Sequence, residues 1–109
     1  MKILLDENIP VKLKFDFGID FEVKTVRDMG WLGKKNGELL GLIASCGIDF
    51  FVTLDKNLRY QQNLEKFDLK IILLMAHSNK PDALQPFVEK VRIFLEEKNY
   101  QKFNEITLE

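Results

Sequence analysis

Residues 50–57, FFVTLDKN, decide the fold class of this chain. The stretch FFVTL is a continuous apolar run, which is typical of a strand buried on both faces of a parallel sheet, and it ends on Asp55. The chain opens in the same way, because KILL at residues 2–5 runs into Asp6. Two buried strands are thus each followed by a carboxylate. These acids either cap the helices that follow or form a functional site.

Short apolar runs alternate with helical patterns along the chain, and this alternation predicts an α/β fold. Strands are expected at 2–5, 21–26, 50–54, 70–75 and, in the tail, 103–109. Helices are expected at about 9–17, 39–46, 56–67 and from Pro81 onward, the last with Ser78 or Asn79 as its cap. We therefore predict a single domain, residues 1–109, with a parallel sheet of four or five strands, right-handed crossovers and helices on both faces.

Composition places the chain among soluble globular proteins, with 46% apolar residues, 30% charged residues and a net charge of -1. Its longest apolar runs are too short to cross a bilayer, so we expect no membrane partner and a cytoplasmic location. The single cysteine, Cys46, excludes an intramolecular disulfide and a cysteine-rich zinc site, and it is expected in the core. Near-neutral charge disfavours a protein coated with positive charge for nucleic-acid binding, although it permits a local basic patch.

Acidic and amide side chains follow the predicted strands at the point where each strand ends. They are Asp6, Glu7 and Asn8 after the first strand, Asp28 after the second, and Asp55 with Asn57 after the third. Glu38, in the first turn of the second helix, can project toward the same edge, where the functional crevice of an α/β sheet lies. Carboxylate and amide oxygens without histidine or thiolate partners suit Mg²⁺ or Mn²⁺, so we predict a metal site.

Each of these residues also has a structural interpretation. Asp6 or Asn8 can cap the first helix, Asp55 the third, and Asn36 the second, with Glu38 favoured beside the positive end of its dipole. One cap per helix suffices, so for Asp6 and Asp55 we favour the metal site, since grouped acids that repel one another are functional candidates. The two interpretations stay balanced for Glu38, while Glu7 and Asp28 are expected to be ordinary loop residues.

Basic residues lie near the same predicted edge. They are Lys34 and Lys35 before the second helix, and Lys56 and Arg59 after Asp55. Together they could hold a phosphate backbone while the acids hold a cation. Taken singly, each is also explained as solvated surface charge.

Three segments together resemble the PIN-like nucleases, specifically the short bacterial branch grouped with VapC-type toxins. They are KILLDENIP at 2–10, VRDMGWLGKKNGELL at 26–40 and FFVTLDKNL at 50–58, and the similarity covers residues 1 to about 75. The resemblance implies a PIN-like domain, Mg²⁺- or Mn²⁺-dependent cleavage of RNA, and metal ligation by Asp6, the acidic position near Glu38, and Asp55. It also implies a small antitoxin protein that blocks the site.

The residues and the resemblance together predict a metal-dependent endoribonuclease of toxin type. Asp6, Glu38 and Asp55, with Asn57 as a further oxygen ligand, would hold a cation that polarises a phosphodiester and activates water. The family often carries acids where this chain has Asn36 and Asn57, and the loss of two charges should weaken cation binding. Expected partners are RNA, a cognate antitoxin and, as an open alternative, a second copy of the chain.

Two other functions stay open. KILLDEN also looks like the opening of a response-regulator receiver domain, with Asp55 as phosphoacceptor, although the receiver lysine should follow a fifth strand and Lys80 follows the fourth. A non-catalytic PIN-like protein that binds a partner is the other alternative. Its support is the nine phenylalanines, which include Phe15, Phe17 and Phe21 close together.

Overall fold

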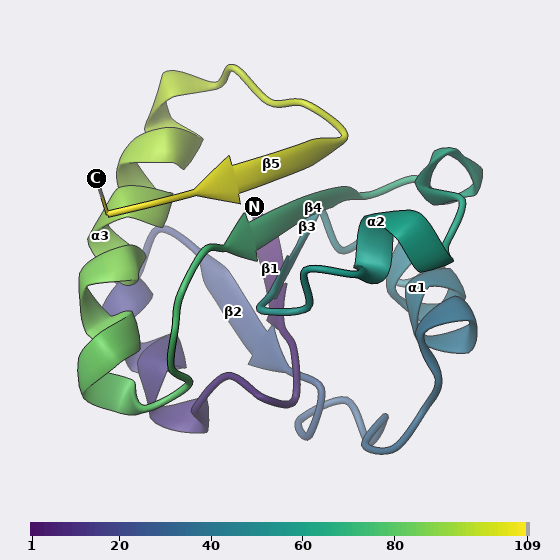
Figure 1. Ribbon diagram of the computed structural model, residues 1–109, viewed down its shortest axis with the longest axis horizontal. Helices are drawn as coiled ribbons and strands as arrows, with labels where there is room; N and C mark the ends of the chain where they lie inside the picture. Colours follow the sequence, from purple (N-terminus) through teal and green to yellow (C-terminus); the bar gives the residue numbers. More distant parts are fainter. Residues whose placement is uncertain (109) are drawn as a thin grey trace.

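Five parallel strands form one sheet, with helical segments packed on both of its faces (Figure 1). The structure is a computed structural model and describes residues 1–108. The strands are β1 (Lys2–Leu5), β2 (Glu22–Thr25), β3 (Phe50–Thr53), β4 (Lys70–Leu74) and β5 (Phe103–Ile106). The helices are α1 (Asn36–Ser45), α2 (Leu58–Gln61) and α3 (Pro81–Glu97), with 3₁₀ segments η1 (Val11–Phe17) and η2 (Leu64–Lys66). The predicted α/β class is confirmed, and a strand lies in each of the five predicted places; the one predicted at 103–109 ends at Ile106, and residue 109 lies outside the described residues.

The strand order is β2-β1-β3-β4-β5, and every neighbouring pair is parallel. From β1 the chain first moves outward to β2 and then returns across β1 to β3 on the other side. β1 and β3 are direct neighbours, with Leu5 opposite Val52. The strand order therefore reverses between β1 and β3, and ligands of open α/β sheets bind at the carboxyl ends of strands at such a reversal.

Alternate residues of the buried strands feed two separate cores. One core lies between the sheet and the layer formed by α3 and η1, and its members include Ile3, Leu5, Leu13, Phe17, Val52, Phe87 and Val91. The other lies between the sheet and the layer formed by α1 and α2, and its members include Leu4, Val26, Leu40, Ile43, Phe51 and Leu58. Because β3 contributes to both cores and is buried along its whole length, its sequence is continuously apolar up to Thr53.

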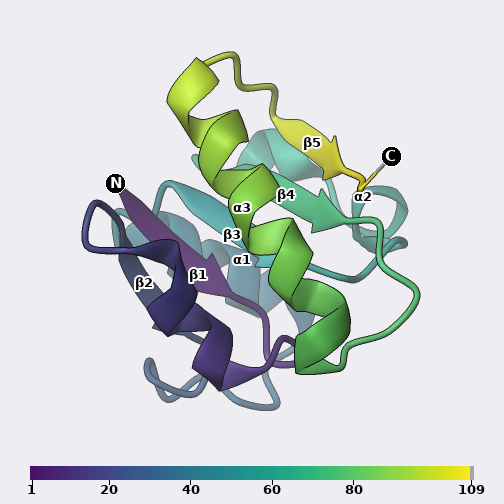
Figure 2. The same cartoon turned by 90° about the vertical axis from the view of Figure 1, so that its left-hand side faces the viewer.

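The helix that connects β4 to β5 lies on a face that the prediction did not anticipate. From β2 onward the chain steps in one direction across the sheet, to β3, β4 and β5. α1 and α2 make the first two steps on one face, whereas α3 makes the third on the opposite face, beside η1 (Figure 2). α3 therefore has the opposite hand to the other connections. Connections between parallel strands are right-handed as a rule. The β4–α3–β5 connection is left-handed, so the prediction of right-handed crossovers is wrong for it.

The helical segments around the first and third strands differ from the prediction. η1 is a 3₁₀ segment where the sequence predicts a helix at about 9–17; its Leu13 and Phe17 are buried, and Phe15 is 75% exposed. The helix expected at 56–67 is two pieces, α2 and η2. Gln62 is extended between them, and the Asn63 side chain accepts a hydrogen bond from the N–H of Glu65, which starts a new turn.

Two local predictions about helix ends are also wrong. The N-terminal boundary of α3 is Lys80, and the Ser78 hydroxyl accepts a hydrogen bond from its N–H, so neither Ser78 nor Asn79 is the N-cap residue. Cys46, which the sequence predicts to lie in the core, is exposed and follows the last turn of α1. The next residue, Gly47, adopts a left-handed conformation with φ of 72° and ends the helix as predicted.

Candidate active site

Thr53 joins the two acids that end β1 and β3. This last residue of β3 is fully buried, and its hydroxyl donates a hydrogen bond of 2.6 Å to Oδ2 of Asp6. The same hydroxyl oxygen accepts a hydrogen bond of 3.0 Å from the N–H of Asp55. The backbone of Asp6 extends the ladder between β1 and β3, because its N–H donates to the carbonyl oxygen of Val52 at 2.9 Å. The structure thus brings Asp6 and Asp55 together at the strand-order reversal.

Asn36 and Asn57 both contact Asp55, in different ways. The amide nitrogen of Asn36, in the first turn of α1, donates to Oδ2 of Asp55 at 3.3 Å. The backbone N–H of Asn57 donates to Oδ1 of Asp55 at 2.9 Å and forms a tight turn before α2. Asn57 therefore supports Asp55 through its backbone, and Asn36 is the neighbour whose side chain reaches the acid pair.

The Asp6 carboxyl group is held in an unfavourable environment for its charge. Burial raises its pKa above the ordinary value, and the nearby charges of Glu7 and Asp55 raise it further. Hydrogen bonds from the Thr53 hydroxyl and the N–H of Glu7 act in the opposite direction but do not cancel the effect. A cation bound beside Asp6 would remove this electrostatic cost.

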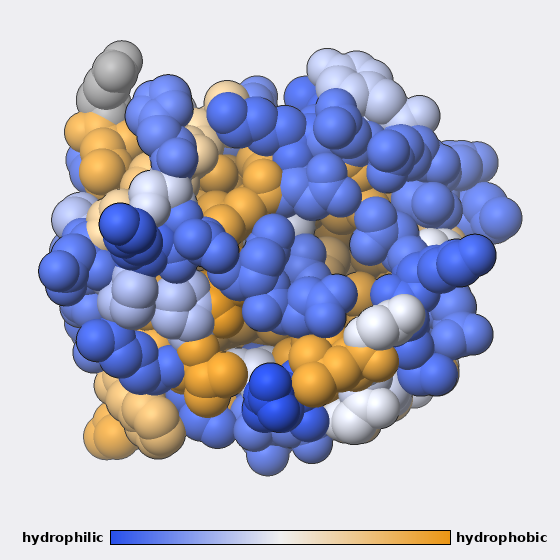
Figure 3. Space-filling view, turned by 60° about the horizontal axis from the view of Figure 1, so that its bottom comes forward, coloured by the Kyte–Doolittle hydropathy of each residue, from blue (hydrophilic) through white to orange (hydrophobic). Residues whose placement is uncertain are grey.

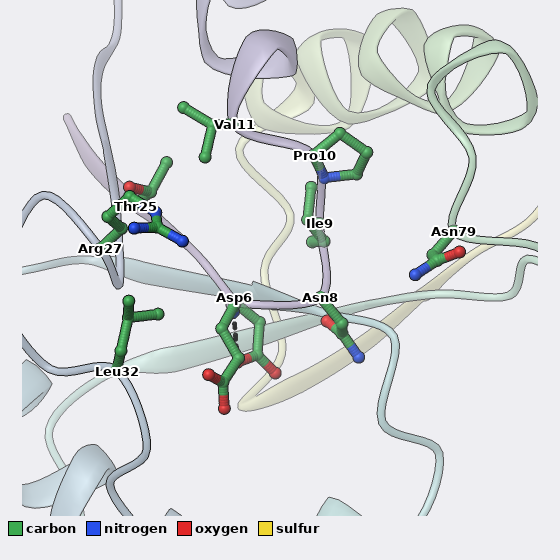
Figure 4. A pocket seen from close by; sticks show the side chains of 10 residues that line it. Asp6, Asn8, Ile9, Pro10, Val11, Thr25, Arg27, Leu32 and Asn79 are labelled. Carbon is green, nitrogen blue, oxygen red and sulfur yellow. Dashed lines mark hydrogen bonds between the residues drawn. The ribbon is translucent and has the colours of Figure 1, made fainter.

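Asp6 borders an open pocket of about 270 Å³ that four segments of the chain form (Figure 4). Its lining includes Asp6, Asn8, Thr25, Arg27, Leu32 and Asn79. Arg27 and Leu32 lie on one side of Asp6, and Asn79 lies on the other. Figure 3, turned to bring the lower side of the molecule forward, shows mostly hydrophilic surface with apolar patches between the polar residues.

Glu38 does not join the acid pair. Its carboxylate forms an ion pair of 3.1 Å with Lys34, one turn earlier in sequence, and its side chain is 60% exposed. Lys34, Lys35 and Glu38 line a separate depression with Gln62. Within residues 1–108, no group of three or more histidine, cysteine, aspartate or glutamate side chains is arranged to hold a metal ion. The geometry thus brings together two acids and one amide.

The two predicted cations after β3 point to different places. The Arg59 guanidinium lies 4.3 Å from the ring centroid of Phe103 and 3.9 Å from the Glu105 carboxylate, so it packs against β5. Lys56 lines a second pocket, together with His77. Lys56 therefore borders a pocket at the carboxyl edge of the sheet, whereas Arg59 pairs with residues of β5.

Asp28 has a structural part in the loop after β2. Its carboxylate pairs with Lys14 of η1 at 3.0 Å and accepts a hydrogen bond of 2.9 Å from the N–H of Thr25. The Lys14 contact is the main reason that the pKa of Asp28 lies below its ordinary value, and the Thr25 N–H adds to it. Asp28 therefore ties η1 to the end of β2, apart from the acid pair.

Sequence reasoning missed two residues of the site, Thr53 and Arg27. Thr53 is the one polar residue in the apolar run FFVTL, and because such a buried residue needs a polar partner, the sequence does carry a signal for it. Arg27 follows β2 directly, so the same strand-end argument could have found it. Its guanidinium forms no ion pair with any residue in the part of the chain that the structure describes.

No family model, curated protein or solved structure matches this chain. Among residues 1–108, no helix has the length and apolar character needed to cross a membrane. The family membership suggested by the three sequence segments therefore stays a proposal.

Proposed function

We propose that this protein is a divalent-cation-dependent ribonuclease of the PIN-like toxin type, in which Asp6 and Asp55 hold Mg²⁺ or Mn²⁺. The observation that carries the proposal is the Thr53 bridge, which links the Asp6 carboxylate to the backbone of Asp55 at the ends of adjacent strands, close enough for the charge of Asp55 to raise the pKa of Asp6. Neighbouring carboxylates that repel one another are candidates for a functional site, and Asp6 borders an open pocket. The family resemblance of the three segments supplies the choice of RNA as substrate.

The donor set of the site fits a hard cation. Asp6 and Asp55 offer carboxylate oxygens, and Asn36 beside Asp55 offers a neutral amide oxygen. Mg²⁺ is commonly bound through one or two carboxylates, with waters and substrate phosphate completing its coordination. When bound, such a cation polarises the phosphodiester, lowers the pKa of a coordinated water and neutralises charge on the leaving oxygen.

The protein residues have distinct parts in this proposal. Thr53 fixes the orientation of Asp6 and donates to the oxygen that faces β3, so that the carboxylate keeps one rotamer. Asn36 holds Asp55 in the same way from α1. Arg27 is placed to contact an RNA phosphate from the rim of the pocket, with Lys35 and Lys56 as further cations along the edge. Lys34 contributes less, because Glu38 already pairs with it.

RNA degradation by the purified protein tests this function. A single-stranded RNA is incubated with wild-type protein in Mn²⁺, in Mg²⁺ and in EDTA, alongside Asp6→Asn, Asp55→Asn and the control Asp20→Asn. Asp20 is an exposed residue before β2, at the opposite edge of the sheet, so it receives the same change outside the site. We expect cation-dependent cleavage that falls about 100-fold in the first two variants and is unchanged in the control. Wild-type protein without cleavage, or equal cleavage in all variants, would refute the proposal.

Exposed apolar residues of η1 and the turn after it favour a second candidate function, the binding of a protein partner. The side chain of Phe15 is 75% exposed and that of Ile19 is fully exposed, whereas the other eight phenylalanines are buried or partly buried. A cognate antitoxin or a second copy of the chain could cover these residues. Light scattering on wild-type protein and Phe15→Ser tests the second copy: a dimer in the wild type that becomes a monomer in the variant would support it.

The strand order favours a third candidate, a receiver-type phosphoacceptor domain, because this order also occurs in receiver sheets. Two features weigh against it. Lys80 precedes α3 and follows β4, and the residues directly after β5 are Thr107 and Leu108. Both carboxylate oxygens of Asp55 already accept hydrogen bonds. Incubation with a small-molecule phosphodonor and Mg²⁺ separates the candidates, since a stable acyl phosphate on Asp55 would support the receiver.

A further inference from the structure

A second pocket, of about 500 Å³, lies at the same edge of the sheet, beyond β3, β4 and β5. Lys56, which directly follows Asp55, lies on its border. The segment 75–78 after β4, the first turns of α3, and the residues after β5 complete its lining. Its size falls within the range of pockets that bind small organic molecules.

The walls of this pocket combine an apolar surface with a few polar groups. Met75, Ala83 and Phe87 supply apolar surface, with Leu108 at the opening. Lys56 supplies a positive charge, His77 an imidazole and Ser78 a hydroxyl. The Ser78 oxygen accepts a hydrogen bond of 3.1 Å from the N–H of Lys80, which leaves the hydroxyl proton able to donate to a ligand.

We infer that this pocket binds the base and ribose of one nucleotide of a single-stranded RNA, and that Lys56 contacts the adjoining phosphate. The inference rests on the proposed function and extends it, because it names the part of the substrate that the second pocket receives. Its basis is the juxtaposition of an apolar pocket with the residue next to Asp55. A phosphate beside the acid pair then has its neighbouring nucleotide within reach of the pocket.

The chemistry of the pocket matches a nucleotide better than a purely apolar or purely anionic ligand. A nucleobase has flat apolar faces and a polar edge, and its phosphate requires a cation. Proteins recognise single-stranded RNA by unstacking bases and placing them against side chains, with hydrogen bonds to the base edge. Met75 and Phe87 can contact the face of a base, His77 and Ser78 can contact its edge, and Lys56 can pair with phosphate.

Binding of nucleoside 5′-monophosphates in EDTA tests the inference without any cleavage. Titrations of AMP, GMP, CMP and UMP are followed by NMR chemical-shift changes and calorimetry. In Ala83→Phe a larger side chain fills the pocket, and the matched control Gln85→Phe adds the same side chain at an exposed position of α3 outside it. We expect at least one nucleotide to shift the resonances of residues 75–78, and its Kd to rise about tenfold in Ala83→Phe only. Equal binding in both variants would overturn the inference.

A second variant removes the charge without touching the shape of the pocket. Lys56→Gln should raise the Kd of the nucleoside monophosphate about tenfold and leave that of the corresponding nucleoside unchanged, because only the former carries a phosphate. Lys90→Gln, at an exposed position of α3, serves as the control. A nucleoside that binds as tightly as its monophosphate would contradict the role given to Lys56.

A short oligoribonucleotide distinguishes a subsite for RNA from a site for free nucleotides. In EDTA, a tetranucleotide should bind more tightly than the monophosphate, displace it, and lose affinity in Ala83→Phe. A monophosphate that binds while the tetranucleotide fails to compete would overturn the RNA assignment. If the wild-type protein binds nucleotides but cleaves no RNA, the proposed ribonuclease function is refuted and the nucleotide pocket is kept. If it cleaves RNA but binds no nucleotide in this pocket, the pocket is refuted and the ribonuclease function is kept.

Discussion

The Thr53 hydroxyl donates a 2.6 Å hydrogen bond to the Asp6 carboxylate, and this contact ties the end of β3 to the end of β1. The same oxygen accepts the N–H of Asp55, so one buried hydroxyl contacts both the Asp6 carboxylate and the backbone of Asp55. In the proposed cation site, Thr53 would support the two ligands without contacting the substrate. Its removal should therefore affect cation binding and stability together.

Thr53→Val tests this role, because valine keeps the shape of threonine and removes the hydroxyl. The N–H of Asp55 and an oxygen of Asp6 lose their partner, so the free energy of unfolding should fall by about 1–3 kcal/mol in urea titrations. Mn²⁺ affinity should fall about tenfold. Thr53→Ser keeps the hydroxyl and should keep Mn²⁺ affinity while losing about 1 kcal/mol for the missing methyl group. A Thr53→Val protein with wild-type Mn²⁺ affinity would exclude the bridging role.

Asp6→Asn tests the electrostatic cost of the site, and its effect should depend on pH. The pKa of Asp6 is raised in the folded protein above the ordinary value of 3.8, so the folded state binds the proton more tightly than the unfolded state. Wild-type stability is therefore lost as the pH rises from about 3.8 through the folded pKa. In EDTA at pH 7, the variant should be more stable by about 1 kcal/mol, as is common when a functional-site cost is removed. Urea denaturation at pH 7 and at pH 3 measures this gain in stability. If the variant is equally stabilised at pH 3, the charge of the Asp6 carboxylate is not the cause of the cost.

Asn36→Asp introduces an acid at a position where the proposed PIN-like family often has one. The new carboxylate lies beside Asp55, whose hydrogen bond from Asn36 is lost, so the variant should be less stable than wild type in EDTA. With Mn²⁺ the order should reverse, because the third carboxylate adds a charged ligand, and affinity should rise about tenfold. Calorimetric titration and thermal unfolding measure both effects. Asn99→Asp, at an exposed position after α3, is the control and should change neither.

Arg27 and Lys34 should differ in their effect on RNA binding. Arg27 borders the pocket of Asp6 and has no ion-pair partner within residues 1–108, whereas Lys34 is paired with Glu38. Arg27→Gln should raise the Kd for single-stranded RNA about tenfold. It should also reduce the slope of log Kd against log salt concentration by about 0.7, because one phosphate contact is lost. Lys34→Gln should have the smaller effect on both. Fluorescence anisotropy in EDTA at several salt concentrations compares them, and a larger loss for Lys34→Gln would contradict the placement of the RNA.

The strands and the acid pair were predictable because their signal is local. A strand buried on both faces needs a continuous apolar run, and a polar residue that ends such a run marks the edge of the sheet. Asp6 and Asp55 each follow such a run, and they lie at the same edge of the sheet because β1 and β3 pair in parallel. An aspartate side chain is short, so the position of its carboxylate follows from the position of the strand end that carries it.

Other features depend on contacts between distant residues and leave no local signal. Asn36 and Glu38 are two residues apart, so they lie on different sides of α1, and Lys34 occupies the position that pairs with Glu38. Arg59 is drawn to Phe103 and Glu105, far along the chain. The side on which α3 crosses the sheet depends in the same way on the packing of its apolar stripe against β1 and η1, which its own sequence does not encode.

Direct titration with Mn²⁺ tests the central claim that Asp6 and Asp55 form a cation site. Calorimetry and electron paramagnetic resonance can compare wild type, Asp6→Asn, Asp55→Asn and the control Asp20→Asn at the same pH and salt. We predict saturable binding in the wild type and the control, with an affinity at least about tenfold lower in each of the two site variants. Equal Mn²⁺ binding by all four proteins, or no binding by the wild type, would contradict the proposed cation site.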